Sequence, residues 1–141
     1  MTKSGNSPFL DIGNDILEIE RVRHCIEEYG TRFLDRIFTK KEQSYCLAFR
    51  DAAPHFAGRF CAKEAIVKAL GTGIGKVVGW QDLEILNDPQ GKPHVFLSEK
   101  ALQHFNHPRI LISISHCKKY VSTVALLIGV KKEKREADTG S

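Results

Sequence analysis

Three charged residues, Asp15, Glu64 and Lys68, have the types and spacing that best fit catalysis or metal binding in this sequence. Glu64 and Lys68 are four positions apart in a segment of helical composition, so they share a helix face, as the members of an ordinary helix ion pair also do. Asp15 ends an expected strand, where a carboxylate could cap the helix that follows. If Asp15 and Glu64 meet, they could instead bind magnesium, which favours one or two carboxylates completed by water and phosphate oxygens.

Two further cations, Arg59 and Lys63, lie earlier in the same helical segment. They are also four positions apart, and like charges at this spacing repel each other, so helix stability gives no reason to place them together. A solvated basic face is one explanation. An anionic ligand bound by these side chains is the other.

The glycine-rich segment at 71–76 and the serines before His116 each suggest a motif that the details disfavour. The segment lacks the hydroxyl residue that follows the lysine of a phosphate loop, and it comes after a helix, which favours a helix end and a turn. Ser115 and His116 are neighbours on an expected strand and point to opposite faces, which disfavours a nucleophile and base. His116 is better explained as a turn residue or a ligand contact.

The elements that must position these residues follow from periodicity and from turn and cap residues. Thr39 begins a capping box, and Pro54 and Gly71 can open and end a long helix at 56–70. Strands at both ends of the chain around central helices predict an α+β fold. We expect strands from 9 to about 15 and at 80–86, 93–97, 109–116 and 120–130, and further helices at 19–29, 39–49 and 98–105.

Length and composition indicate one ordinary globular domain of 141 residues. Hydrophobic residues make up 42% and charged residues 27%, which argues against a disordered or fibrous class. The net charge of +4 favours anionic partners without choosing among nucleic acid, a phosphate ligand and an acidic protein. Without a CxxC pair, a signal-peptide core or an apolar run of about 20 residues, we expect a reduced, cytoplasmic location. We expect a polar leader at 1–8, one domain at 9–130 and a charged tail at 131–141.

Two blocks, residues 12–22 (IGNDILEIERV) and 56–73 (FAGRFCAKEAIVKALGTG), resemble the signatures of holo-acyl-carrier-protein synthases, the short type of 4'-phosphopantetheinyl transferase. The likeness continues through 91–93 and 112–116 and covers residues 9–130. It implies a single α+β domain in which an antiparallel sheet packs against a long central helix. It also implies transfer of the 4'-phosphopantetheine group of coenzyme A to a serine of apo-acyl carrier protein, in support of fatty acid biosynthesis, with release of adenosine 3',5'-bisphosphate.

The same resemblance implies roles for individual residues. Asp15 and Glu64 match magnesium ligands, and together with Lys68, which matches a lysine near the diphosphate, they form the implied catalytic set. The proton of the acceptor serine could pass to a carboxylate or to a metal-associated water, and the base is left open. The residues implied for coenzyme A are Arg59, Lys63, Lys68, Gly71 and His116.

The resemblance also implies partners, namely a homotrimer with sites between neighbouring subunits and an acidic carrier protein received by the first helix. We expect Arg21, Cys25 and Arg32 to contact the carrier protein, although Glu27 and Glu28 make this helix less basic than the family pattern. Nucleic acid and membranes are not expected partners. Two other functions are alternatives. One is a non-enzymatic anion-binding module, suggested by the net charge and by Arg59 and Lys63, and the other is a magnesium-dependent hydrolase of coenzyme A or nucleotides, which would use the same residues as the transferase.

Overall fold

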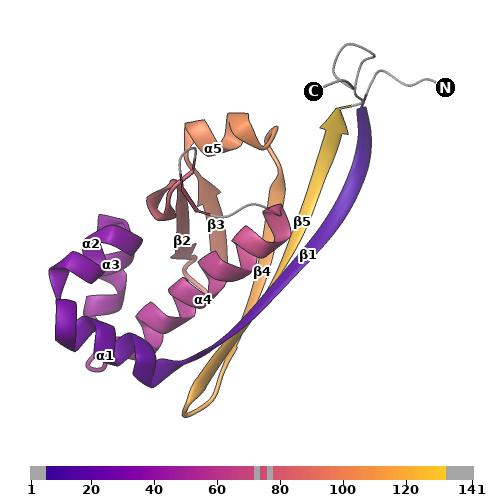
Figure 1. The fold of residues 1–141 in the computed structure, drawn as a ribbon. Helices are drawn as coiled ribbons and strands as arrows, with labels where there is room; N and C mark the ends of the chain where they lie inside the picture. Colours follow the sequence, from indigo (N-terminus) through magenta and orange to yellow (C-terminus); the bar gives the residue numbers. More distant parts are fainter. Residues whose placement is uncertain (1–5, 72–73, 76–77, 133–141) are drawn as a thin grey trace.

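The fold is a three-stranded antiparallel sheet with one long helix, α4 (Ala53–Leu70), lying across a face of the sheet (Figure 1). The computed structural model describes residues 6–71, 74–75 and 78–132. This arrangement confirms the predicted α+β domain. The sheet has the order β1 (Asn6–Glu18), β5 (Tyr120–Lys132), β4 (Arg109–His116), and a hairpin of β2 (Leu83–Asn87) and β3 (Pro93–Leu97) packs beside β4. The other elements are α1 (Ile19–Tyr29), α2 (Thr31–Ile37), α3 (Lys40–Leu47), the 3₁₀ turn η1 (Trp80–Asp82) and α5 (Glu99–His104).

The pairing of the sheet places two predicted site residues on opposite edges. β1 pairs along its whole length with one side of β5, and Asp15 lies opposite Thr123. β4 pairs with the other side of β5. Asp15 therefore belongs to one edge strand, and His116 ends the other.

Helix α4 begins and ends where its sequence predicts. Pro54 lies in its first turn, where a missing amide hydrogen removes no helix bond, and Gly71 ends it in a left-handed conformation with φ of 77°. β1 crosses this helix at Gly13, where a Cβ atom would lie 2.2 Å from the carbonyl oxygen of Ala65 and 2.5 Å from the amide nitrogen of Ala69. Only glycine permits this approach, and it brings the following residues of β1 close to the helix.

Two hydrophobic clusters share α4 as a common wall. The first joins the helix to α1 and the segment after α2 through Val22, Phe38 and Phe56, which are almost completely buried. The second joins the later turns of the helix to the hairpin and the sheet, with Ile66 and Leu83 among its members. Because close-packed surroundings fix the helix on both sides, the polar side chains that it carries have defined positions.

Most predicted elements are confirmed, with differences at their ends. The helix at 19–29 and the capping box at Thr39 are present, and the box is completed by Glu42. The strand expected at 80–86 is wrong over its first three residues, because these form η1 and β2 begins only at Leu83. The pattern does not predict α2, whose seven residues are too few for a clear helical period.

The first and last strands of the chain are longer than expected. β1 begins at Asn6 and continues past Asp15, its predicted end, to Glu18, and β5 extends to Lys132. Within the glycine-rich segment that we expect to form a turn, residues 72, 73, 76 and 77 lie outside the described part of the chain. No helix in the described part is long and apolar enough to cross a bilayer.

Candidate active site

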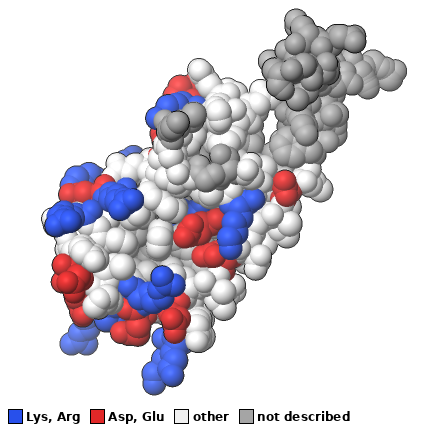
Figure 2. Space-filling model, viewed as in Figure 1, with Lys and Arg blue, Asp and Glu red and all other residues white. Residues whose placement is uncertain are grey.

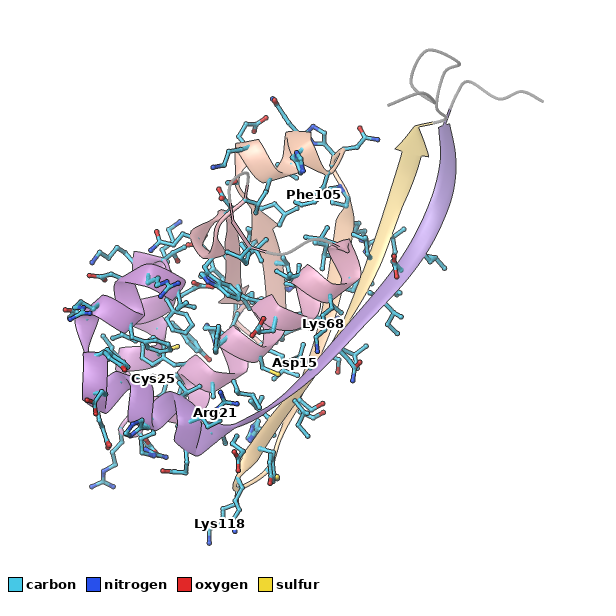
Figure 3. All side chains as sticks on the ribbon, viewed as in Figure 1. Asp15, Arg21, Cys25, Lys68, Phe105 and Lys118 are labelled. Carbon is cyan, nitrogen blue, oxygen red and sulfur yellow. The ribbon has the colours of Figure 1, made fainter. Side chains whose placement is uncertain are left out.

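A charged cluster forms where β1 lies against α4, and it brings together the three predicted catalytic residues. The Lys68 ammonium group donates to Asp15 Oδ1 at 2.9 Å and to the carbonyl oxygen of Asn14 at 3.1 Å. Figure 3 shows Asp15 and Lys68 on these neighbouring elements, and Figure 2 shows acidic and basic side chains grouped over the same region. Glu64, one turn before Lys68 on the helix, feels the charge of both residues. The close approach at Gly13 is what makes this cluster possible.

The charged cluster contains two carboxylates and one ammonium group, so the negative charge of Glu64 is only partly neutralised. Burial raises the pKa of Glu64, the nearby Asp15 carboxylate raises it further, and Lys68 only partly offsets these effects. Lys68 itself has a raised pKa, chiefly because it donates to Asp15. Among the described residues, no side chain donates a hydrogen bond to the Glu64 carboxylate. A cation beside Glu64 and Asp15 would relieve this imbalance.

The donor chemistry of Asp15 and Glu64 fits magnesium. Both are carboxylates, and Mg²⁺ is typically held by one or two of these with water and phosphate oxygens in its remaining positions. The described residues contain no group of three or more His, Cys, Asp or Glu arranged to hold a metal. Asp15 and Glu64 could supply two carboxylates to a metal whose other ligands are water and phosphate oxygens.

A second site, which we call the Arg59 pocket, lies between the start of α4, the β2–β3 hairpin and the end of β4. It is a cleft of about 250 Å³, lined by Tyr45, His55, Arg59, Asn87 and His116 among others. The structure thus brings together two residues predicted for coenzyme A, Arg59 and His116. Burial lowers the pKa of His55, and the positive charges of Arg59 and His116 lower it further.

Lys63 does not join either site, although the sequence predicts that it binds coenzyme A. Its side chain is completely buried, and its ammonium group donates to Glu42 Oε1 at 2.7 Å, to the Ile37 carbonyl at 2.8 Å and to the Trp80 carbonyl at 3.1 Å. Three acceptors satisfy the three donors of a lysine. The geometry therefore assigns Lys63 to the interior of the fold rather than to a ligand.

The remaining predicted residues fall in two places. Gly71 forms the left-handed end of α4, one turn beyond Lys68. Cys25 and Arg32 line a groove of about 590 Å³ between α1 and α2. Arg21 is exposed one turn before Cys25 on α1, and Figure 3 shows both on this helix. The predicted carrier-binding residues therefore share one region.

Sequence reasoning missed several residues that line these sites. Phe33 and Arg36 line the α1–α2 groove, but they belong to α2, which the pattern does not reveal. Tyr45 and Asn87 reach the Arg59 pocket from a short helix and from the end of a strand. In the sequence, these two positions carry only structural signals, a capped helix and a turn.

The chain belongs to the 4'-phosphopantetheinyl transferase superfamily, whose family model matches residues 11–125. Curated relatives point to one branch of this class. A holo-[acyl-carrier-protein] synthase of Protochlamydia amoebophila is 56% identical over 117 residues, which cover 83% of this chain and 96% of the relative. The enzyme of the same name from Chlamydia felis is 49% identical, with coverage of 83% and 95%.

Solved structures agree with this assignment. Holo-[acyl-carrier-protein] synthase of Helicobacter pylori, in complex with coenzyme A, is 33% identical with a TM-score of 0.74, and the match covers 85% of this chain and 99% of that one. The Bacillus anthracis enzyme, in complex with CoA (3',5'-ADP), is 34% identical with a TM-score of 0.75 and coverage of 87% and 99%. The fold and the branch of the family therefore agree with the sequence resemblance.

Proposed function

We propose that this chain transfers the 4'-phosphopantetheine group of coenzyme A to a serine of apo-acyl carrier protein and releases adenosine 3',5'-bisphosphate. The observation that carries the proposal is the cluster of Asp15, Glu64 and Lys68 in a member of this superfamily. Two carboxylates and a lysine are the groups needed to bind a diphosphate with its metal and to stabilise the charge that develops on the leaving phosphate.

In the proposed reaction, the serine oxygen forms a bond to the phosphorus attached to pantetheine, and the bond from that phosphorus to the bridging oxygen breaks. Magnesium held by Asp15 and Glu64 would supply charge neutralisation on the diphosphate oxygens. Lys68 is exposed and bonded to Asp15, so its ammonium group can turn to the oxygen that leaves with adenosine 3',5'-bisphosphate. The serine proton passes to a carboxylate of the cluster or to water.

The Arg59 pocket is the proposed site for the anionic nucleotide end of coenzyme A. Arg59, His55 and His116 converge on it, and each can donate to phosphate oxygens. The pocket lies beside edge strand β4, whereas Asp15 lies on edge strand β1 at the opposite side of the sheet. We therefore propose that one coenzyme A molecule uses the pocket of one subunit and the charged cluster of its neighbour.

Exposed apolar side chains support the proposed homotrimer. The sheet face turned away from α4 carries exposed side chains on all three strands, and Ile12 remains 64% exposed and Ile16 65% exposed. Such a contiguous apolar surface is typical of a contact between subunits. The residues of this face are Leu10, Ile12 and Ile16 of β1, Leu111 of β4 and Val124 of β5.

The groove between α1 and α2 is the proposed site for the carrier protein. It combines the apolar surface of Tyr29 and Phe33 with the positive charges of Arg32 and Arg36. An acidic protein with a hydrophobic contact patch suits this combination. We propose that the reaction serves fatty acid biosynthesis in the cytoplasm, in keeping with four cysteines that form no disulfide.

Mass spectrometry of an apo-acyl carrier protein tests the proposal. The carrier is incubated with this chain, coenzyme A and magnesium, beside a reaction with chelator. We expect a mass gain of one phosphopantetheine that chelator prevents. If folded protein adds nothing to several apo-carriers, the proposal is wrong, and consumption of coenzyme A without carrier would identify a hydrolase instead.

A further inference from the structure

Arg59 is a buried cation without an acidic partner. Only 5% of its surface is exposed, and among the described residues no carboxylate lies within ion-pair distance of it. Its Nε atom is buried and has no hydrogen-bond partner in the described part of the chain. Burying a charge is costly unless it is paired, so the fold holds this guanidinium in an unfavourable state when no ligand is present.

Two neutral groups hold Arg59 in place. Its Nη2 atom donates to Asn87 Oδ1, and its guanidinium carbon lies 4.2 Å from the centre of the Tyr45 ring. A ring face and an amide oxygen both attract a cation without cancelling its charge. Tyr45 comes from α3 and Asn87 from the end of β2, so the guanidinium is held from two sides.

The amide of Asn87 is itself fixed. Its Nδ2 atom donates to the Gly91 carbonyl at 2.7 Å, across the turn of the β2–β3 hairpin. With the amide reversed, its NH₂ group would face a guanidinium that can only donate, and its oxygen would face a carbonyl that can only accept. One orientation therefore satisfies both neighbours, and it presents oxygen to Arg59.

We propose that Asn87 and Tyr45 are positioning residues that keep Arg59 oriented but not neutralised, so that its charge remains available to the anionic end of coenzyme A. This inference rests on the proposed function. A carboxylate at position 87 would be a stronger partner for Arg59, because it would neutralise the guanidinium charge. It would also compete with the phosphate of the ligand for the same guanidinium.

The decisive variant is Asn87→Asp, which keeps an oxygen acceptor and adds a negative charge. We expect the Kd and the KM for coenzyme A to rise about tenfold or more, because the new carboxylate pairs with Arg59 and the guanidinium charge is no longer available to the ligand. The turnover number at saturating coenzyme A should change far less than Kd and KM do. The fall in melting temperature should be too small to explain the loss of affinity. Isothermal titration with coenzyme A, steady-state kinetics and thermal melting supply the three readouts. The matched control is Gln103→Glu, which adds the same charge to an exposed side chain of α5, away from the residues that line the pocket, and should leave Kd near that of the wild type.

Comparison with Asn87→Ala separates the proposal from a purely structural role. If position 87 only needs an acceptor for Arg59, Asn87→Asp should bind coenzyme A better than Asn87→Ala does. The proposal requires the opposite order, and the structural order would overturn it. If the position 87 variants do not fold, Tyr45→Leu and Tyr45→Phe test the proposal instead. Tyr45→Leu should lose more affinity for coenzyme A than Tyr45→Phe does, because it lacks the aromatic ring. Equal affinities of the two variants would overturn the proposal.

The two proposals fail in different ways. If the wild type transfers phosphopantetheine but Asn87→Asp binds coenzyme A as tightly as the wild type, only the positioning role is wrong. If the wild type binds coenzyme A and responds to Asn87→Asp as expected but never modifies a carrier, only the transfer reaction is wrong.

Discussion

Two buried cations on α4, Lys63 and Arg59, have opposite surroundings although they are one helical turn apart. Lys63 is paired with the Glu42 carboxylate and two carbonyl oxygens, all from the protein. Arg59 has an amide oxygen and an aromatic ring, and its charge is not neutralised by any described residue. The charge pattern of a helix therefore does not reveal which cation is available to a ligand. The residues facing the helix decide it.

Glu42 shows how completely Lys63 is committed to the fold. Its Oε1 atom accepts from Lys63 and from the Thr39 amide at 2.9 Å, and its Oε2 atom accepts from the Ile85 amide of β2 at 2.7 Å. One carboxylate thus connects α3, α4 and the hairpin. No comparable acid holds Arg59 among the described residues.

The largest effect is expected from breaking the Lys63 pair. Glu42→Ala should lower the free energy of unfolding by about 3–5 kcal/mol, because it leaves a buried ammonium group without its counter-charge. Urea denaturation measures this loss, with the exposed Glu27→Ala as the control. The double variant Glu42→Gln/Lys63→Met should recover much of the stability, since it removes both charges. A loss below about 1 kcal/mol in Glu42→Ala would contradict the difference drawn between the two cations.

The third cation of the helix, Lys68, extends the comparison because it is exposed and bonded to a carboxylate of the proposed site. Lys68→Ala should reduce turnover about 100-fold, as expected when a donor to developing charge is removed, with little change in stability. Transfer assays at saturating coenzyme A and carrier protein measure it. An effect confined to carrier affinity would show that Lys68 does not act on the leaving phosphate.

Removing the charge of Arg59 should weaken coenzyme A binding rather than lower stability, and this effect should be smaller than those of Glu42→Ala and Lys68→Ala. Arg59→Gln should raise the KM for coenzyme A about tenfold, because the ligand loses a charge partner, while the protein is not destabilised as Glu42→Ala is. Kinetics and thermal melting of the two variants together measure the contrast. Similar losses of stability and no change in KM would mean that both cations serve the fold.

The smallest effect concerns pH and the neighbour of Arg59 in the pocket, His55. Burial and the charges of Arg59 and His116 lower the pKa of His55. The unfolded chain therefore binds a proton more readily, so the stability of the ligand-free protein should fall as the pH falls through the usual histidine range. A phosphate bound in the pocket favours the protonated form of the His55 ring. Coenzyme A should therefore bind more tightly as the pH falls through the same range.

Titration calorimetry at several pH values checks this pH dependence. His55→Gln should flatten the pH profiles of stability and affinity, and it also controls for titration of the phosphate itself. Unchanged profiles in the variant would assign the pH dependence to another group.

Much of the fold and part of the site could be predicted because the signals are local. The capping box at Thr39, the glycine that ends α4 and the four-residue spacing of Glu64 and Lys68 all act within one or two turns. The role of Lys63 could not be predicted, because its partner Glu42 comes from another helix 21 residues earlier. The same holds for Asn87, which reaches Arg59 only because the hairpin packs beside α4.

The close approach of β1 and α4 at Gly13 makes strand register and site assembly a single event. A slip of β1 by one residue would press the Cβ of Ile12 or Asn14 into the helix backbone, and it would turn Asp15 to the opposite face of the sheet. The protein therefore cannot form a well-packed fold with β1 in the wrong register. Every molecule that completes the packing at Gly13 also has Asp15 beside Lys68, so correct folding ensures that the charged cluster is assembled.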